Sequence, residues 1–400
     1  MNNNLSVLWR FLLDAGYDAT LLTLPGEPDH FSLSADSFRR NHPIERVSTL
    51  ELFDLRRFLS IPPAQIRRAI KPYDFVIACG ASLGFLSRAG IPIDLAIPYG
   101  AEFLDHGSYR LTRPNILHHF NAYVYWNKQA FRHSINSLML DYTNPWYESF
   151  FEKQRSGAKR YYLAPPMIYA PEFSPETMSS LPADSDIVER FAELRRKFDL
   201  VVFHHSSHNW RNPRRVWTYK GNHNLFIGFA EFKRKTGANA CIVTFEYGLE
   251  VDETKKLIGE LGIESEVYWF AKTPRKNLLQ GIHRADVVVG EMNPERSFNT
   301  YGVALEAMAM GRPLMHHRQD SLYHRYHKEL YPMLNASSPE DVEEGLTWAL
   351  QCPAERERMG EQARLWFNNY GVEKPLALVE QLIAEKAGAN WPSRKTGSNF

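Results

Sequence analysis

Short runs of contiguous apolar and β-branched residues alternate along the chain with longer segments whose apolar residues recur every three or four positions. Contiguous apolar runs are typical of buried parallel strands, and the wider spacing is typical of amphipathic helices. Repeated alternation of the two predicts an α/β fold with doubly wound parallel sheets. Strands are predicted at 18–24, 73–80, 93–97, 199–203, 240–245, 267–270, 285–289 and 314–315. Helices are predicted at 5–13, 82–89, 225–237, 253–261, 276–285, 303–310, 341–350, 354–370 and 375–387.

The chain has 400 residues, which is enough for two domains. A stretch rich in Ser, Pro and Asp at 174–186 separates two regions of alternating elements. The first region opens on a helix rather than on a strand and a glycine-rich loop, so we expect its domain to lack its first strand. The predicted first domain is 1–173, and a linker with a helix that leads into the second domain follows at 174–198. The predicted second domain is 199–370. A C-terminal helix is predicted at 371–389 and a disordered tail at 390–400.

Global charge excludes a general nucleic-acid binder, because 47 Lys and Arg residues against 46 Asp and Glu residues leave a formal net charge of +1. An anion site must therefore be local. The three cysteines have no metal-binding spacing, which indicates a reducing compartment, and we expect a cytoplasmic protein. We expect no metal site, since the only Asp-x-Asp pair, Asp184 and Asp186, lies in the predicted linker.

One such local cluster follows the predicted strand at 199–203. Arg211, Arg214, Arg215 and Lys220 lie within a loop at 204–222, while the chain as a whole is nearly neutral. Ligands of doubly wound sheets bind at the carboxyl ends of strands, and converging cations suit a diphosphate. The alternative interpretation is that these cations simply lie on a solvated surface.

The stretch after the predicted strand at 285–289 carries an unusual carboxylate. A polar segment that includes Asn299, Thr300 and Gly302 leads into a helix of small apolar residues, and Glu306 lies inside that helix. The unpaired N–H groups at the start of such a helix suit a phosphate. A carboxylate among apolar residues costs free energy unless another group pairs with it. Its spacing also allows Glu306 to lie on the helix surface.

The sequence Gly302-Val-Ala-Leu-Glu306-Ala-Met-Ala-Met-Gly-Arg-Pro313 closely resembles the signature of glycosyltransferase family 4, whose members are retaining nucleotide-sugar transferases of GT-B fold. This resemblance implies two Rossmann-like domains that face a cleft, with the nucleotide sugar on the second and residues 371–389 crossing back to the first. It implies that Glu306 accepts hydrogen bonds from the donor ribose. We assign the further donor-binding positions to Ser206, Asn299, Thr300, Tyr301 and Gly302.

Lys220 and the following glycine also resemble the family, which places a Lys and an Arg on the donor diphosphate. The partner of Lys220 is then Arg215 or Arg214, and we assign Lys220 and Arg215 as catalytic and Arg214 as donor-binding. The family usually has a second Glu eight positions before Glu306. Here that position is Phe298, and the candidates to replace it are Glu295, Ser297 and Asn299.

The turn at 98–102 resembles the cleft-side turn of the acceptor domain in the same family. Tyr99 stands where that family often has a His, so we predict no catalytic His. Glu102 is the candidate catalytic residue of this turn, and loop capping is its alternative role.

The resemblance implies transfer of a sugar from a nucleotide diphosphate to a hydroxyl of a glycan or lipid-linked acceptor, in surface polysaccharide biosynthesis. It implies no metal and no cofactor besides the donor substrate. A peripheral contact with the inner face of the membrane is a further expectation. Two alternatives are a sugar-nucleotide-binding partner subunit without activity and a nucleotide-sugar 2-epimerase.

Overall fold

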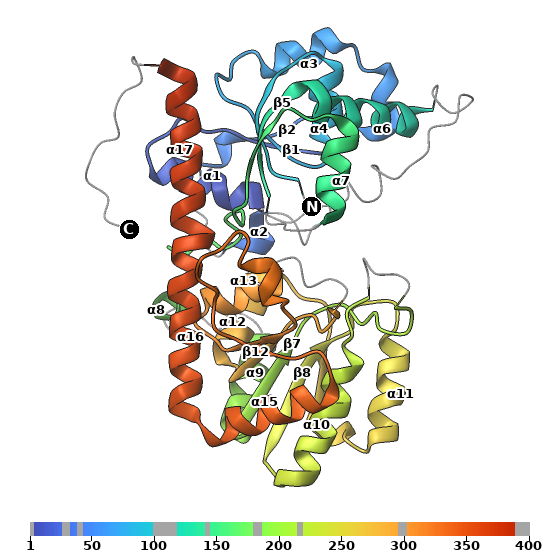
Figure 1. Cartoon of the computed structure of the whole chain (residues 1–400), viewed down its shortest axis with the longest axis vertical. Helices are drawn as coiled ribbons and strands as arrows, with labels where there is room; N and C mark the ends of the chain where they lie inside the picture. Colours follow the sequence, from blue (N-terminus) through green and yellow to red (C-terminus); the bar gives the residue numbers. More distant parts are fainter. Residues whose placement is uncertain are drawn as a thin grey trace. The chain divides into compact units, whose positions relative to one another are not determined.

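The computed structural model describes residues 4–25, 33–37, 43–98, 118–140, 145–178, 186–213, 219–294 and 302–388. The chain divides into two compact units. The first unit is drawn from 1–34, 39–166 and 370–400, and the second from 35–38 and 167–369. The divisions predicted from the sequence lie after 173, 198, 370 and 389. Figure 1 shows the elements of both units in chain order.

The second unit contains a parallel sheet in the order β12-β11-β10-β7-β8-β9. From β7 the chain moves outward through β8 to β9, then returns to the other side of β7 and continues through β10, β11 and β12. The order of strands therefore reverses between β7 and β10, as in a Rossmann fold. These strands are β7 (Leu200–His204), β8 (Ala240–Phe245), β9 (Val267–Phe270), β10 (Val287–Val289), β11 (Leu314–His316) and β12 (Leu334–Asn335).

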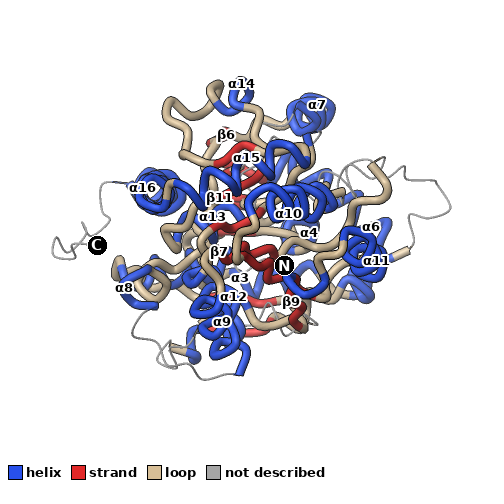
Figure 2. Tube along the Cα trace, turned by 90° about the horizontal axis from the view of Figure 1, so that it is seen from below, coloured by secondary structure: helices blue, strands red, loops and turns tan. Residues whose placement is uncertain are grey.

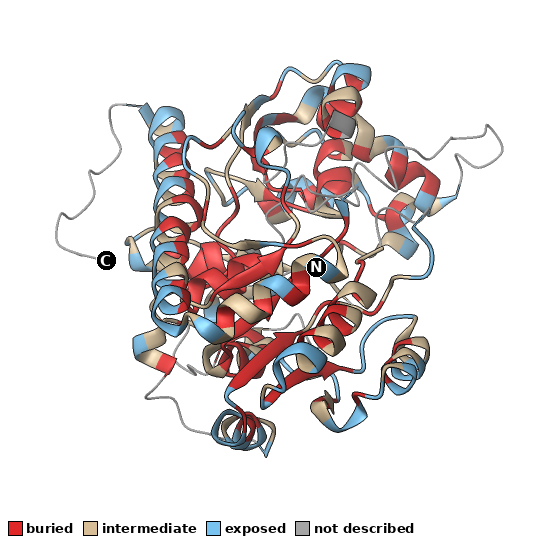
Figure 3. Cartoon of the chain, turned by 60° about the horizontal axis from the view of Figure 1, so that its bottom comes forward, coloured by how far each residue is buried: buried red, intermediate tan, exposed pale blue. Residues whose placement is uncertain are grey.

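Helices cover both faces of this sheet because successive side chains of each strand point to opposite faces. In β7, Leu200 and Val202 belong to an apolar core shared with α10 and α15. Phe203 instead packs its ring against Phe191 of α9, with ring centroids 5.6 Å apart. Figure 2 shows α9 and α12 on one side of β7 and α10 and α15 on the other, and Figure 3 shows the strands as buried. The helices of this unit are α8 (Pro175–Met178), α9 (Asp186–Lys197), α10 (His223–Thr236), α11 (Val251–Leu261), α12 (Arg275–Arg284), α13 (Gly302–Ala309), α14 (Asp320–Tyr323), α15 (Pro339–Gln351) and α16 (Pro353–Phe367).

The first unit contains a parallel sheet in the order β3-β4-β5-β6 and a separate parallel pair, β1 and β2. Its strands are β1 (Leu21–Thr23), β2 (Val47–Thr49), β3 (Ile77–Ala78), β4 (Ile93–Ala96), β5 (Ile135–Met139) and β6 (Lys159–Tyr161). Its helices are α1 (Asn4–Asp14), α3 (Pro63–Ile70), α4 (Ser82–Arg88), α6 (His119–Gln129), α7 (Pro145–Gln154) and α17 (Lys374–Ala387), while α2 (Leu33–Asp36) spans the division between the units.

Helix α17 joins the core of the first unit although it is the last element in the described part of the chain. Its apolar stripe includes Leu378 and Leu382, which pack in one cluster with Leu8 of α1 and Leu95 of β4. The spacing of four residues between Leu378 and Leu382 brings both side chains to the same helix face. Burial of this stripe holds the C-terminal helix in the first unit.

The α/β fold with parallel sheets that the sequence predicts is confirmed. No helix among the described residues combines the length and the apolar character needed to cross a membrane.

Candidate functional site

The site lies where the order of strands in the second unit reverses. Because β7 and β10 are parallel neighbours, their carboxyl ends lie at the same edge of the sheet. The loop after β7 begins at His205, and the loop after β10 begins at Gly290. Crevices of this kind bind ligands in open α/β sheets.

Lys220 and Glu291 come from these two loops and form an ion pair between the Lys220 Nζ and the Glu291 Oε1. The backbone joins the same loops, since the Met292 N–H donates to the Lys220 carbonyl oxygen at 2.9 Å. The Lys220 N–H in turn donates to the Asn209 carbonyl oxygen at 2.6 Å. An ammonium group has three N–H donors, so Lys220 can bind Glu291 and an anionic ligand together.

The contact between the loops requires a glycine after Lys220. Gly221 has a φ of +68°, and a Cβ atom placed there would lie 2.7 Å from the Met292 carbonyl oxygen. Ordinary contacts of a Cβ atom are longer than 3 Å. A side chain at this position would therefore push the loop that carries Lys220 away from the loop that carries Glu291.

Gly221→Ala is predicted to lower the free energy of unfolding by about 3 kcal/mol, since it combines left-handed backbone strain with overpacking. The matched control is Gly262→Ala, because Gly262 has a φ of +67° with open space around it. The control carries the backbone term alone, about 1 kcal/mol. Urea unfolding of both variants measures the difference. Equal losses in the two variants would show that the loops do not approach each other this closely.

A buried polar network supports the base of the loop after β7. Thr244 in β8 lies 2.9 Å from His204 Nδ1 and 3.0 Å from His208 Nε2. The Asn222 Nδ2 donates to His204 Nε2 at 2.9 Å. Burial lowers the pKa of His204 well below its usual value and that of His208 to about 4, so both imidazoles are neutral at pH 7. The network therefore fixes the loop without adding charge beneath it.

Glu306 in α13 is buried and has two cationic or polar partners. Arg275 Nε, at the start of α12, donates to Glu306 Oε1 at 2.7 Å. His205 Nε2, just after β7, lies 2.7 Å from Glu306 Oε2. Arg275 also pairs with Asp36, its Nη1 being 3.3 Å from the Asp36 Oδ1. The carboxylate inside the apolar helix is thus paired, and the interpretation of Glu306 as a helix-surface residue is wrong.

Electrostatics keep Glu306 charged in this setting. Burial raises the pKa of Glu306, and its contacts with Arg275 and His205 lower it. The lowering is the larger effect, so the pKa lies below its ordinary value of 4.5. Burial lowers the pKa of Arg275, and the neighbouring Glu306 and Asp36 carboxylates raise it above its ordinary value. At neutral pH the site therefore holds a carboxylate and a guanidinium in contact, with a second carboxylate behind the guanidinium.

Three buried polar atoms next to this cluster have no hydrogen-bond partner within the described part of the chain. They are His205 Nδ1, Ser206 Oγ and Arg275 Nη2. Nearly all buried polar atoms in proteins are paired, so such a group indicates space for a polar ligand or water. A neutral His205 that donates from Nε2 presents an acceptor at Nδ1, whereas Arg275 Nη2 is a donor. The carboxylate of Glu306 keeps further lone pairs for ligand hydroxyl groups.

The structure places four of the residues that the sequence nominates. Lys220, Glu306 and Ser206 lie in the loops and helix at the carboxyl edge of the sheet, and Gly302 is the first residue of α13. The remaining nominated residues lie outside the described residues: Glu102, Arg214, Arg215, Asn299, Thr300 and Tyr301.

Sequence reasoning missed His205, Arg275, Glu291 and Asp36. A signal existed for three of them, because His205, Arg275 and Glu291 each follow the carboxyl end of a predicted strand. Asp36 carries no such signal. Its segment is assigned to the second unit although the flanking residues of the chain belong to the first.

Comparison with known proteins gives one family match. Residues 213–366 match the model of the family described as Glycosyl transferases group 1. This range includes both Lys220 and Glu306. A search of curated protein sequences gave no significant match.

Solved structures resemble the whole chain at low identity. WaaG, a glycosyltransferase involved in lipopolysaccharide biosynthesis, is 15% identical, with a TM-score of 0.57 over 96% of this chain and 95% of its own. HepE from Anabaena, solved with UDP-glucose, is 14% identical, with a TM-score of 0.55 over 86% of this chain and 87% of its own. A glycosyltransferase from Rickettsia africae is 12% identical, with a TM-score of 0.60 over 97% of this chain and 95% of its own.

These similarities identify the fold as that of GT-B glycosyltransferases. The family match includes Lys220, Glu291 and Glu306 of the site. The parallel sheet, its point of strand reversal and the carboxyl-edge loops occupy the matched range or adjoin it. The match of residues 213–366 to the glycosyl transferases group 1 family, together with the fold of the whole chain, therefore supports a glycosyltransferase.

Proposed function

We propose that this protein transfers a sugar from a nucleotide diphosphate to an acceptor hydroxyl with retention of anomeric configuration. The observation that carries the proposal is that two charged groups lie at one edge of the sheet. Lys220 follows β7 and supplies a cation, and Glu306 in the helix after β10 supplies a buried, paired carboxylate. A diphosphate needs the cation, and a ribose with two hydroxyl groups needs the carboxylate.

The proposed roles follow from where charge develops. When the bond from the anomeric carbon to the diphosphate oxygen breaks, negative charge grows on the diphosphate, and Lys220 stabilises it. The acceptor oxygen forms the new bond to the anomeric carbon and gives up its proton to the departing diphosphate oxygen. Glu306 holds the ribose hydroxyls, and Arg275 and His205 keep the Glu306 carboxylate in one orientation. The reaction as proposed uses no metal ion and no cofactor.

UDP-hexoses are the first donors to test, because HepE was solved with UDP-glucose. Candidate acceptors are glycans and lipid-linked oligosaccharides, since WaaG is described as acting in lipopolysaccharide biosynthesis. The protein, incubated with UDP-glucose, UDP-galactose, UDP-N-acetylglucosamine or GDP-mannose, is expected to release the nucleoside diphosphate only when an acceptor is present. A donor that binds the native state is also expected to raise its melting temperature.

The anomeric configuration of the product, read by NMR from the coupling at the new linkage, tests retention. An inverted product would overturn the retaining mechanism while leaving sugar transfer intact. If the protein converts the donor to its C2 epimer without an acceptor, its activity is epimerisation and not sugar transfer. If the donor binds but is not turned over with any acceptor tested, the protein is a sugar-nucleotide-binding protein.

A further inference from the structure

A pocket of about 570 Å³ lies in the first unit, and none of its lining residues belongs to the site described above. Its apolar lining includes Val76, just before β3, and Ile91, just before β4. It therefore lies at the amino ends of these parallel strands.

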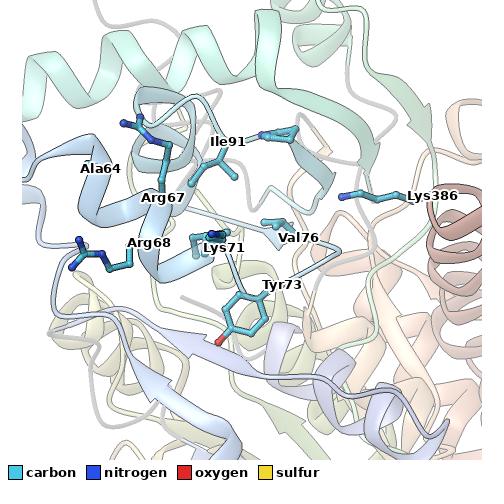
Figure 4. A pocket seen from close by; sticks show the side chains of 10 residues that line it. Ala64, Arg67, Arg68, Lys71, Tyr73, Val76, Ile91 and Lys386 are labelled. Atoms are coloured by element: carbon cyan, nitrogen blue, oxygen red, sulfur yellow. The ribbon is translucent and has the colours of Figure 1, made fainter.

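Four cationic side chains line this pocket, and no Asp or Glu is among the lining residues. Arg67 and Arg68 come from α3, and Lys71 follows that helix directly. Lys386 comes from α17, more than three hundred positions away in the sequence. Figure 4 shows Lys386 extending into the pocket from the side opposite Arg67 and Arg68.

Two of the cations are held in place by contacts behind the pocket. The Asp94 carboxylate accepts hydrogen bonds from Lys386 Nζ and from the Val76 N–H, both at 2.7 Å. Asp94 is buried, so it fixes Lys386 without facing the pocket's solvent. Arg67 Nη1 donates to the Ala89 carbonyl oxygen at 3.1 Å. Arg68 and Lys71 are exposed and form no ion pair with any other described residue.

The end of α3 explains part of this charge but not all of it. Cations in the last turn of a helix are favoured by the helix dipole, which accounts for Arg67 and Arg68. Lys386 approaches the same place from α17 because it pairs with Asp94, which offsets its charge. The remaining cations have no carboxylate partner among the described residues, so they repel one another, and an anionic ligand would offset that repulsion.

We propose that this pocket binds a phosphate-bearing group. Arginine guanidinium groups match phosphate oxygens in a bidentate geometry, and the lysines add point charges. The apolar side chains of Val76 and Ile91 suit the carbon skeleton attached to the phosphate. The half-buried Tyr73 also lines the pocket. The phosphate belongs either to a soluble phosphorylated molecule or to a lipid headgroup.

The test compares wild type with the double variant Arg68→Ser/Lys71→Ser, which removes two exposed cations from the pocket. The control is Arg57→Ser/Lys153→Ser, which removes two exposed cations of the same unit outside the pocket lining. Each protein is titrated with inorganic pyrophosphate by calorimetry and co-sedimented with phosphatidylcholine vesicles with or without phosphatidylglycerol. The donor site is the same in all three proteins, so differences between them report on the pocket.

The pocket variant is expected to bind at least one of these probes about tenfold more weakly than wild type, and the control is expected to bind as wild type does. Loss of pyrophosphate binding alone assigns a soluble ligand, and loss of sedimentation with phosphatidylglycerol vesicles assigns a lipid headgroup. Donor turnover is expected to stay unchanged, because no exchanged residue belongs to the donor site. Equal binding of both probes by the pocket variant and the control, or no binding by wild type, would overturn the proposal.

Discussion

Lys220→Ala will lower kcat/KM for the nucleotide-sugar donor by about 10²–10³-fold, which is the usual effect of losing one preorganised charge that stabilises a transition state. Lys220 can have this effect because it follows β7 at the point of strand reversal, where its loop meets the loop after β10. The measurement is the initial rate of nucleoside diphosphate release with a fixed acceptor.

This variant also affects stability, because it leaves Glu291 buried and unpaired with Lys220. The side chain of Glu291 is only 6% exposed, and breaking such a pair costs about 3 kcal/mol. The double variant Lys220→Ala/Glu291→Gln removes the leftover charge. Its melting temperature is expected to recover toward that of wild type while its rate stays as low as that of Lys220→Ala. Recovery of the rate together with stability would show that Lys220 is structural and not catalytic.

Glu306→Gln is expected to raise the dissociation constant of the donor about 10–100-fold, because a hydrogen bond to a charged group contributes roughly 1.5–3 kcal/mol. The amide keeps the size of the side chain and one acceptor oxygen for Arg275, so the site keeps its shape. It loses the charge that strengthens the hydrogen bonds from the ribose hydroxyls. Calorimetric titration with the donor or its nucleoside diphosphate measures the change.

Stability as a function of pH checks that Glu306 is ionised in the folded protein. Its folded pKa is depressed, so its contribution to stability is complete above the unfolded pKa and is lost as the pH falls through the folded value. Melting temperatures measured from pH 7 down to about pH 3 are therefore expected to fall more steeply for wild type than for Glu306→Gln.

The matched control for this variant is Glu343→Gln in α15. Glu343 is also largely buried in the second unit, pairs with Lys235 at 2.7 Å and has a lowered pKa. It lies outside the carboxyl-edge loops, so its exchange is expected to change stability without changing donor affinity. If Glu306→Gln likewise changed only stability, the ribose-binding role of Glu306 would be wrong.

The sequence predicted the strands β7 to β11 of the second unit, because β7 and β8 are buried and mostly apolar. It missed β12, which has only two residues. It was less successful in the first unit. A strand was predicted at 73–80, but β3 is confined to Ile77–Ala78, and the Asp94 carboxylate takes the N–H of Val76 just before it. The strand β5 was missed because Asn136 and Ser137 interrupt its apolar run.

Local pattern alone determined that this chain is an α/β protein, that a cationic loop and a carboxylate-bearing helix each follow a buried strand, and that this carboxylate needs a partner. Only the tertiary structure decided which residues are the partners. Arg275 lies 31 positions from Glu306, His205 lies 101 positions away, and Asp36 lies 239 positions from Arg275. Such contacts depend on which parallel strands are neighbours in the sheet. Hydrophobic pattern specifies that a strand is buried, but it does not specify the strand beside it.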